Sequence, residues 1–273
     1  MVRPKKHLGQ HFLTDLNTAQ RIVESMTYPA SCNVMEIGPG KGVLTQFLIK
    51  KEIDLKLVEL DIESVEYLKS NFDLNKMEVI SADVLKIPFS EVFSNQSFSI
   101  IGNFPYNISS QIIVQLIKSR GIVSRTVLMF QKELAQRITA QPGCKDYGRL
   151  TVMLGYCADI KKLADIKASL FFPKPKVDSV VLEIKFKPNV KYPANNEAFL
   201  FRVIKAAFSK RRKTLKNALA GSELHIDAKT ALHVLESINI KPVRRAETLT
   251  VQEFVKLSNL LENLIGLKTI RYI

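Results

Sequence analysis

Short apolar runs bounded by turn-forming residues recur through the first two thirds of the chain. They cover residues 33–37, 55–60, 77–81, 98–102 and 126–130. Runs this short and this apolar are typical of strands buried on both faces of a parallel sheet. The segments between them, 43–51, 62–71 and 109–118, space their apolar residues as helices do. The alternation predicts an α/β fold built around a doubly wound, mostly parallel sheet.

The pattern changes after two more expected strands, over 151–159 and 177–186. Pro188 and the residues that follow it interrupt both strand and helix periodicity, which indicates a linker. The remainder of the chain has helical spacing. We therefore predict one domain over 1–188 and a small all-α domain over 189–273.

The predicted second domain is also basic. Thr250 and Glu253 have the spacing of a capping box that opens a last helix. The chain has 40 Lys and Arg against 26 Asp and Glu, a net charge of +14 with a pI near 9.6, and +8 of that charge falls on 189–273. Such a surplus favours a polyanionic partner, with nucleic acid first, although a solvated basic surface explains the charge equally well.

Composition disfavours several other classes. No stretch approaches the roughly 18 apolar residues of a membrane span, and no apolar run follows the basic start, so we expect a soluble, unexported, cytoplasmic protein. Cys32, Cys144 and Cys157 are odd in number and lack a CxxC pair. Neither a disulfide framework nor a zinc site is indicated.

A glycine-rich turn follows the first predicted strand, in Val-Met-Glu-Ile-Gly-Pro-Gly-Lys-Gly over 34–42. Gly38 and Gly40 allow the backbone to approach a ligand where a side chain would clash. The GxGxG spacing differs from the GxGxxG that seats a pyrophosphate, and Pro39 removes one donor. The turn therefore favours a nucleoside without phosphates, with a purely structural turn as the alternative.

Two carboxylates follow later strands. Glu59 lies 17 residues beyond Gly42, near the spacing at which an acidic residue accepts the hydroxyls of a ribose. Asp83 lies just beyond the next predicted strand and is suited to accept from the exocyclic amine of an adenine, although an Asp that caps its own turn is an equal competitor. Both should lie at the same sheet edge as the glycines.

The segment Asn103-Phe104-Pro105-Tyr106 leaves the apolar strand over 98–102. The amine of adenine is a poor nucleophile because its lone pair is delocalised, so acceptors on its hydrogens favour attack. Asn103 offers a side-chain carbonyl, and Phe104 offers a main-chain carbonyl that Pro105 holds extended. Tyr106 can stack on the base. The combination predicts methylation of an adenine amine, against the alternative of an ordinary strand-ending turn with a buried tyrosine.

Ordered motifs make the sequence resemble the rRNA adenine dimethyltransferase family, and within it the KsgA type. They are GQHFL at 9–13, EIGPGKG, VELD, the Asp83 segment, GNFPYNIS and FFPKPKVDS at 171–179. The resemblance implies a class I, Rossmann-like methyltransferase with a seven-stranded sheet. It also implies S-adenosylmethionine as cofactor and N6,N6-dimethylation of two adjacent adenines near the end of small-subunit (16S) rRNA.

The same resemblance assigns roles to individual residues. The residues expected to contact the cofactor are His11, Leu13, Gly38, Glu59, Asp83 and Asn103. Phe171 is expected to form a second aromatic wall for the target base. Many members have Asn where this chain has His11, so either its side chain or its backbone is expected to make the contact. His7 and His11 are not accompanied by a carboxylate or Cys cluster, so no metal is expected.

The basic tail is the expected contact with RNA. Its candidate residues are Lys210, Arg211, Arg212, Lys213, Arg244 and Arg245. A charge run is usually a solvated face, but beside the methyltransferase motifs we expect these side chains to contact phosphates of the small (30S) subunit. The 210–213 run is expected on a helix. We expect a monomer.

Three alternatives remain. The related methyltransferase of 23S rRNA that confers macrolide resistance shares the core motifs. In that enzyme, however, the motif corresponding to GQHFL begins with serine, which disfavours this alternative. A DNA adenine methyltransferase is disfavoured because 273 residues leave no room for a target-recognition domain. A small-subunit assembly factor in which catalysis is secondary is also consistent with the sequence.

Overall fold

The computed structural model describes residues 2–5 and 8–270, with side chains up to Ile265. The chain forms two compact units. The first comprises Met1–Ala135 with Ala158–Pro188, and the second comprises Gln136–Cys157 with Asn189–Ile273. A division after Pro188 agrees with the break in the sequence pattern. That residues 136–157 join the second unit was not indicated by any sequence pattern.

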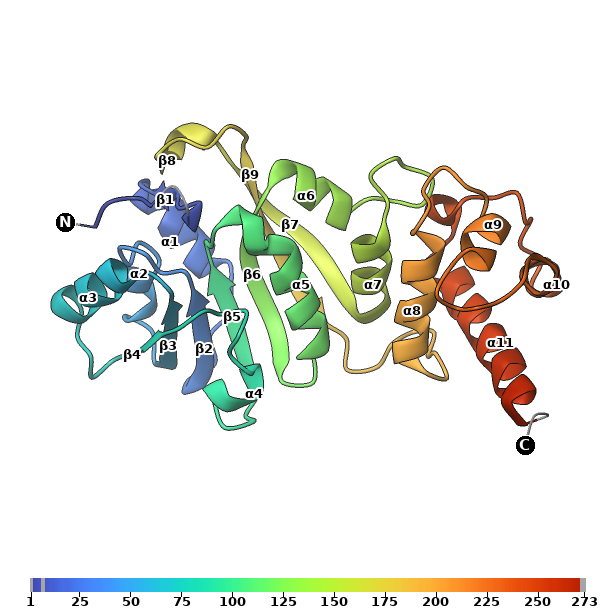
Figure 1. The fold of residues 1–273 in the computed structure, drawn as a ribbon. Coiled ribbons are helices and arrows are strands. Elements are labelled where there is room, and N and C mark those ends of the chain that lie inside the picture. The colour runs from blue at the N-terminus through green and yellow to red at the C-terminus, as the bar shows by residue number, and fades with distance from the viewer. Residues whose placement is uncertain (1, 6–7, 271–273) are drawn as a thin grey trace. The chain divides into compact units, whose positions relative to one another are not determined.

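The first unit is built on a seven-stranded sheet (Figure 1). Its strands, in spatial order, are β4 (Glu78–Ser81), β3 (Ile53–Glu59), β2 (Cys32–Ile37), β5 (Phe98–Gly102), β6 (Val123–Gln131), β9 (Ser179–Phe186) and β7 (Ala158–Ile166). The pairs from β4 to β6 are parallel, and β9 is antiparallel to both of its neighbours. The predicted α/β class and the mostly parallel sheet are confirmed.

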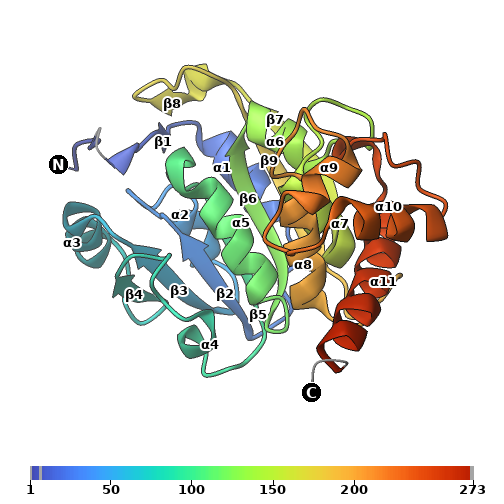
Figure 2. The ribbon, with the colours of Figure 1, turned by 45° about the vertical axis from the view of Figure 1, so that its right-hand side comes forward.

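Helices cover both faces of this sheet. Three helices, α1 (Leu16–Glu24), α2 (Thr45–Leu48) and α3 (Ile62–Asn71), pack buried apolar residues against one face of β2, β3, β5 and β6. On the other face, α5 (Ser109–Lys118) lies in front of the sheet in Figures 1 and 2. The short α4 (Phe89–Val92) borders a cluster in which the Phe89 and Phe93 rings contact Phe98. The helix predicted over 43–51 is shorter than expected, because α2 covers only four residues of that range. The helices predicted over 62–71 and 109–118 are confirmed.

The prediction of a strand over 151–159 was wrong. Residues Arg149–Cys157 form helix α7, and strand β7 begins only at Ala158. Helix α7 buries Thr151, Val152, Leu154, Tyr156 and Cys157, so its apolar residues are nearly continuous. Such a run lacks the periodicity that separates a buried helix from a buried strand.

A second, two-stranded sheet joins distant parts of the chain. β1 (Phe12–Leu13) pairs antiparallel with β8 (Phe171–Phe172), with Phe12 opposite Phe172 and Leu13 opposite Phe171. The main-chain N–H and the hydroxyl of Thr14 both donate to the Leu170 carbonyl, at 2.8 and 2.9 Å. The N-terminal motif and the FFPKP motif are therefore one structural element.

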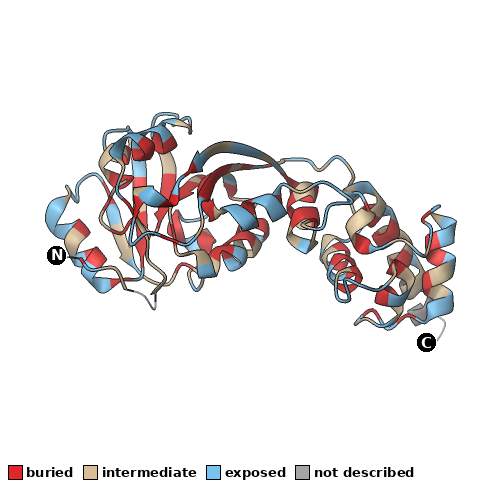
Figure 3. Cartoon of the chain, turned by 90° about the horizontal axis from the view of Figure 1, so that it is seen from above, coloured by how far each residue is buried: buried red, intermediate tan, exposed pale blue. Residues whose placement is uncertain are grey.

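The second unit is helical in the part described. Besides α7 it contains α8 (Glu197–Ala207), α9 (Leu215–Ala220), α10 (Ala228–Ser237) and α11 (Val251–Ile270), and a further helix, α6 (Lys132–Ile138), spans the division between the units. These helices carry both buried and exposed residues (Figure 3). The predicted capping box is confirmed, because the Thr250 N–H donates to Glu253 and the Glu253 N–H donates to Thr250 Oγ1. Among the described residues, no helix combines the length and the apolar composition needed to cross a membrane.

Candidate active site

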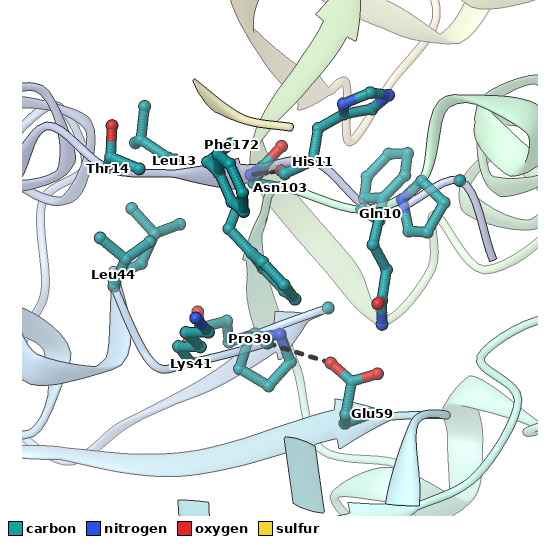
Figure 4. A pocket seen from close by; sticks show the side chains of 18 of the residues that line it. Gln10, His11, Leu13, Thr14, Pro39, Lys41, Leu44, Glu59, Asn103 and Phe172 are labelled. Carbon is teal, nitrogen blue, oxygen red and sulfur yellow. Dashed lines mark hydrogen bonds between the residues drawn. The ribbon is translucent and has the colours of Figure 1, made fainter. Parts of the chain in front are cut away.

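A cavity of about 410 Å³ opens at the carboxyl ends of β2, β3 and β5, where Gly38, Glu59 and Asn103 line it. In Figure 4, Glu59 and Pro39 lie on one side of the cavity, and His11, Asn103 and Phe172 lie on the opposite side. A smaller cavity of about 150 Å³ shares Gly38 and Glu59 with it and reaches Asp83. Ligands of open α/β sheets bind at such strand ends.

The glycine turn requires glycine where it meets the rest of the site. Gly38 and Gly40 have φ of +67° and +56°, which disfavours residues with a Cβ. A Cβ on Gly38 would lie 3.2 Å from the Asn103 carbonyl oxygen and 3.2 Å from Phe104 Cα. The glycine turn and the NFPY segment therefore approach each other backbone to backbone.

Glu59 ends β3 and has an exposed fraction of only 7 %. One carboxylate oxygen accepts from the Gly40 N–H at 3.0 Å, and the other accepts from the N–H groups of Leu60 and Asp61, each at 2.9 Å. Burial raises the pKa of this carboxyl, and the three N–H donors oppose that rise. A carboxylate offers about four acceptor positions, so one remains for a ligand hydroxyl.

Asp83 caps its own turn and also lies beside a cavity. One oxygen accepts from the Leu85 N–H at 3.0 Å, which caps its own turn. The side chain is also part of the lining of the smaller cavity. One carboxylate oxygen is thus committed to the turn, and the other lies 3.9 Å from the exposed Lys86 amine.

Asn103 directly follows β5, and its side-chain amide donates to the main-chain carbonyl of His11 at 3.4 Å. Phe104 is 2 % exposed and packs its ring edge-on against Phe130, with 5.9 Å between the ring centroids. The Phe104 ring is therefore part of the core, so only its main chain is available to a substrate. Both residues line the larger cavity.

Tyr106 is held on two sides. Its hydroxyl is hydrogen-bonded to the buried Ser179 hydroxyl at 2.6 Å, and burial raises the pKa of the phenol. The His11 ring stacks on the Tyr106 ring with 6.0 Å between centroids and 20° between planes. His11 Nδ1 in turn donates to the Pro173 carbonyl at 2.6 Å. His11 therefore connects the N-terminal, NFPY and FFPKP motifs.

The structure corrects the expectation for Phe171. Phe171 is 4 % exposed and packs in the main core, and it does not line the cavity. Phe172 is 62 % exposed and does line it. Neighbouring side chains of a strand point to opposite faces, so a strand that buries one of these rings exposes the other. Leu13 lines the cavity but is 3 % exposed, because its side chain also belongs to the core.

Several lining residues were not identified from the sequence. Glu36 on β2 is 1 % exposed, accepts from the Thr45 hydroxyl at 2.7 Å and reaches the cavity. Burial raises its pKa to about 8. Gln10 also lines both cavities and donates to Asp61 at 3.2 Å. The acidic residue before a glycine turn was a usable signal for Glu36, whereas nothing in the local sequence relates Gln10 to Asp61.

The basic residues of the second unit differ in availability. Residues 208–213 form a turn between α8 and α9 and not the expected helix, and Lys210, Arg212 and Lys213 are exposed there. Arg211 is exposed too, but its guanidinium donates to the Lys145 carbonyl.

Arg244 was expected to contact RNA, but the structure gives its guanidinium other partners. It is paired with Glu253 and donates to Thr248 Oγ1 at 3.1 Å, next to the capping box of α11. Its donors are therefore occupied within the fold. The neighbouring Arg245 is exposed.

No group of three or more His, Cys, Asp or Glu side chains with metal-binding geometry occurs within residues 2–5 and 8–265. His7 lies outside the described residues. His11 has a main-chain carbonyl and an aromatic ring as its neighbours.

The strand order, the glycine turn after β2 and the carboxylate at the end of β3 define the class as a class I methyltransferase. The family model for ribosomal RNA adenine dimethylase matches residues 1–258. The chain therefore belongs to the ribosomal RNA adenine dimethylase family.

Individual relatives agree with this assignment. The chain is 48 % identical over 265 residues to the ribosomal RNA small subunit methyltransferase A of Desulforapulum autotrophicum, covering 96 % of this chain and 93 % of the relative. It is 40 % identical to the protein of the same name in Flavobacterium johnsoniae, covering 96 % and 97 %. A dimethyladenosine transferase from Plasmodium falciparum superposes with a TM-score of 0.78 at 28 % identity, covering 93 % of this chain and 98 % of that one. The 23S rRNA methyltransferase ErmE, at 22 % identity and a TM-score of 0.67, shares the fold.

Proposed function

We propose that the chain transfers methyl groups from S-adenosylmethionine to the N6 amines of two adjacent adenines near the 3′ end of 16S rRNA, giving N6,N6-dimethyladenosines. This reaction would take place in the cytoplasm during maturation of the small ribosomal subunit. Family membership and the names of the relatives support the substrate class. The structural observation that carries the proposal is the Asn103 amide, held by His11 at the edge of a cavity that also contains the cofactor turn.

The residues present fit S-adenosylmethionine. Gly38 brings main chain to the cavity where a side chain would collide with Asn103 and Phe104. Glu59 retains an acceptor position for a ribose hydroxyl, and Asp83 lines the adjoining cavity, where an adenine amine requires an acceptor. Gly40, His11 and Leu13 also line the larger cavity, where they would contact the cofactor. When bound, the cofactor supplies an electrophilic methyl group.

Asn103 and Phe104 prepare the adenine amine for attack. Because Asn103 Nδ2 donates to the His11 carbonyl, its Oδ1 is the free end of the amide and accepts one amine hydrogen. The Phe104 carbonyl accepts the other, in a main chain that Pro105 restricts to an extended conformation. Two acceptors localise the nitrogen lone pair, and the alkylated nitrogen then loses its proton to water without a dedicated base.

Tyr106 holds the target base by stacking. Its orientation is fixed by Ser179 at one end and by His11 on one face. A base stacked on an aromatic ring gains roughly 1–3 kcal/mol, which offsets the cost of taking an adenine out of its own stack. The second unit, with exposed Lys210, Arg212, Lys213 and Arg245, would bind rRNA phosphates as the C-terminal RNA-binding domain.

We also propose that one chain suffices and that no metal ion takes part. Each role above is filled by a side chain or main-chain group of a single chain. Sedimentation of the protein with and without small subunits tests the monomer, and activity after dialysis against a chelator tests the metal.

The experiment that tests the function uses methyl-labelled S-adenosylmethionine with isolated small and large subunits that lack dimethyladenine. We expect label in small subunits, in the form of N6,N6-dimethyladenosine at two adjacent positions when the rRNA is digested and mapped. Label confined to large subunits would instead establish the macrolide-resistance type of activity. Label in neither would refute methylation of assembled rRNA.

A further inference from the structure

Phe172 presents an aromatic ring at the mouth of the active-site cavity. It is 62 % exposed, and among the large apolar side chains described in the first unit only Ile62 is more exposed. Its ring lies on the same side of the cavity as His11 and Asn103 (Figure 4). A Phe side chain left in water forgoes the stabilisation that burial of its apolar surface would contribute. A partner that covers the ring would recover that stabilisation.

The segment that carries Phe172 is fixed in place before any partner binds. On its N-terminal side, Leu170 accepts two hydrogen bonds from Thr14, and Phe172 pairs with Phe12 across the two-stranded sheet. On its C-terminal side, the Pro173 carbonyl accepts from His11 at 2.6 Å. The ring is therefore preorganised for binding a ligand.

Two cations follow the ring in Phe172-Pro173-Lys174-Pro175-Lys176. Lys174 and Lys176 are both exposed, and neither forms an ion pair with a carboxylate within the described part of the chain. An aromatic ring followed by unpaired cations is the arrangement that binds single-stranded nucleic acid, because the ring stacks a base and the cations bind the adjoining phosphates.

We propose that Phe172 stacks on the nucleobase adjacent to the target adenine, and that Lys174 and Lys176 bind the phosphates of the same strand. This inference deepens the proposed function and depends on it. Tyr106 is the candidate partner of the target base, because it is mostly buried and anchored by Ser179 and His11. Phe172 is at the mouth of the same cavity, where the next nucleotide of the strand would have to lie.

A second stacking position would be useful for a substrate that contains two adjacent adenines. While one adenine is in the cavity, the other is the neighbouring base that Phe172 would hold. Stacking there would keep the strand engaged between successive transfers. Because Phe172 would hold the flanking base, it should affect RNA affinity more than the rate of transfer from a saturated complex.

The test compares Phe172→Leu, which keeps apolar bulk, with Phe172→Tyr, which keeps the ring. The dissociation constant of small subunits that lack dimethyladenine is measured with protein loaded with S-adenosylhomocysteine, and the single-turnover methylation rate is measured at saturating subunits. We expect Phe172→Leu to weaken binding by about 5- to 150-fold and to change the saturated rate much less than the affinity. Phe172→Tyr should bind as the wild type does. Leu74→Ala, at a residue 51 % exposed and outside both cavities, is the matched control.

A double variant, Lys174→Gln with Lys176→Gln, tests the binding of phosphates by these cations. It should reduce the slope of log affinity against log salt by roughly 0.7 for each phosphate that is no longer neutralised. Unchanged subunit affinity in Phe172→Leu would overturn the proposal. A fall in the saturated rate with affinity retained would also overturn it, because the ring would then act on the target base. If the wild-type protein methylates no small subunits, the proposed function fails instead, so the two failures are distinguishable.

Discussion

The side-chain amide of Asn103 is fixed by the main-chain carbonyl of His11, a residue 92 positions earlier in the chain. An amide has one donor end and one acceptor end, so a partner for Nδ2 determines where Oδ1 is available. The N-terminal motif therefore orients a group that the NFPY segment alone leaves free to rotate. His11 orients Asn103 through its main-chain carbonyl, while its ring stacks on Tyr106 and donates a hydrogen bond to the Pro173 carbonyl.

Asn103→Ala should reduce the saturated methylation rate by on the order of 100-fold or more, the loss typical when a preorganised hydrogen-bonding group is removed from an active site. Asn103→Asp should be no better, because a carboxylate cannot donate to the His11 carbonyl. Single-turnover rates on small subunits measure this effect. Asn71→Ala, which removes an exposed amide that donates to the Tyr67 carbonyl of its own helix, is the control. Full activity in Asn103→Ala would contradict the assignment.

Glu59→Gln should weaken binding of S-adenosylhomocysteine. The replacement puts an NH2 group among three N–H donors and removes acceptor capacity for a ribose hydroxyl. We expect a loss of about 10- to 100-fold, measured by calorimetry, with thermal unfolding of the free protein as the check on folding. Burial raises the pKa of Glu59, and only the ionised form is a full acceptor, so wild-type affinity should fall as the pH drops through that raised pKa. A flat wild-type profile would refute this.

Glu36→Gln should change how stability depends on pH. Burial raises the Glu36 pKa from 4.5 to about 8, so its protonated form stabilises the folded state. That contribution is fully present below pH 4.5 and is lost as the pH rises towards 8. Urea unfolding between pH 5 and 9 should therefore show the variant gaining on the wild type with increasing pH, by on the order of 1–4 kcal/mol at the upper end. Glu66→Gln, at an exposed position on α3, should leave the profile unchanged.

Strand and helix alternation made the first unit predictable. The runs over 33–37 and 98–102 correspond closely to β2 and β5, because strands buried on both faces leave a short apolar run between turns. The same criterion failed at α7, where a buried helix left an equally continuous run. The β1–β8 pair was not predictable, since each strand has two residues and its partner is more than 150 positions away.

The site was predictable where function depends on the main chain or on a strand end. Gly38 and Asn103 directly follow strands and Glu59 ends one, so their sequence position fixes their place in the fold. Which of Phe171 and Phe172 lines the cavity depends on which face of a short strand meets the core. Two adjacent aromatic residues in the sequence give no signal for that. The pairing of Arg244 with Glu253 was not predicted, because Glu253 lies beyond a turn whose geometry the charge pattern does not contain.

Tyr106→Phe should distinguish the contribution of the aromatic ring from that of the hydroxyl group. The variant keeps the stacking surface but loses the hydrogen bond to Ser179, so we expect a loss of about 3- to 10-fold in methylation rate. Tyr106→Ala should lose far more, because no ring remains to hold the extruded base. Ser179→Ala removes the same hydrogen bond from the other side and should match Tyr106→Phe. A Tyr106→Ala variant with the wild-type rate would refute the stacking role.

Arg212→Gln and Arg244→Gln should have different effects on RNA binding and on stability, although both remove one positive charge from the second unit. Arg212 is exposed in the turn after α8, so its loss should weaken small-subunit binding and reduce the salt dependence without changing stability. Arg244 is paired with Glu253 beside the capping box of α11, so its loss should lower the free energy of unfolding by about 1–3 kcal/mol. Urea unfolding and subunit binding at several salt concentrations, measured on both variants, make the comparison. If Arg244→Gln altered only the salt slope, its guanidinium would bind phosphate after all, and the ion pair with Glu253 would not stabilise the fold.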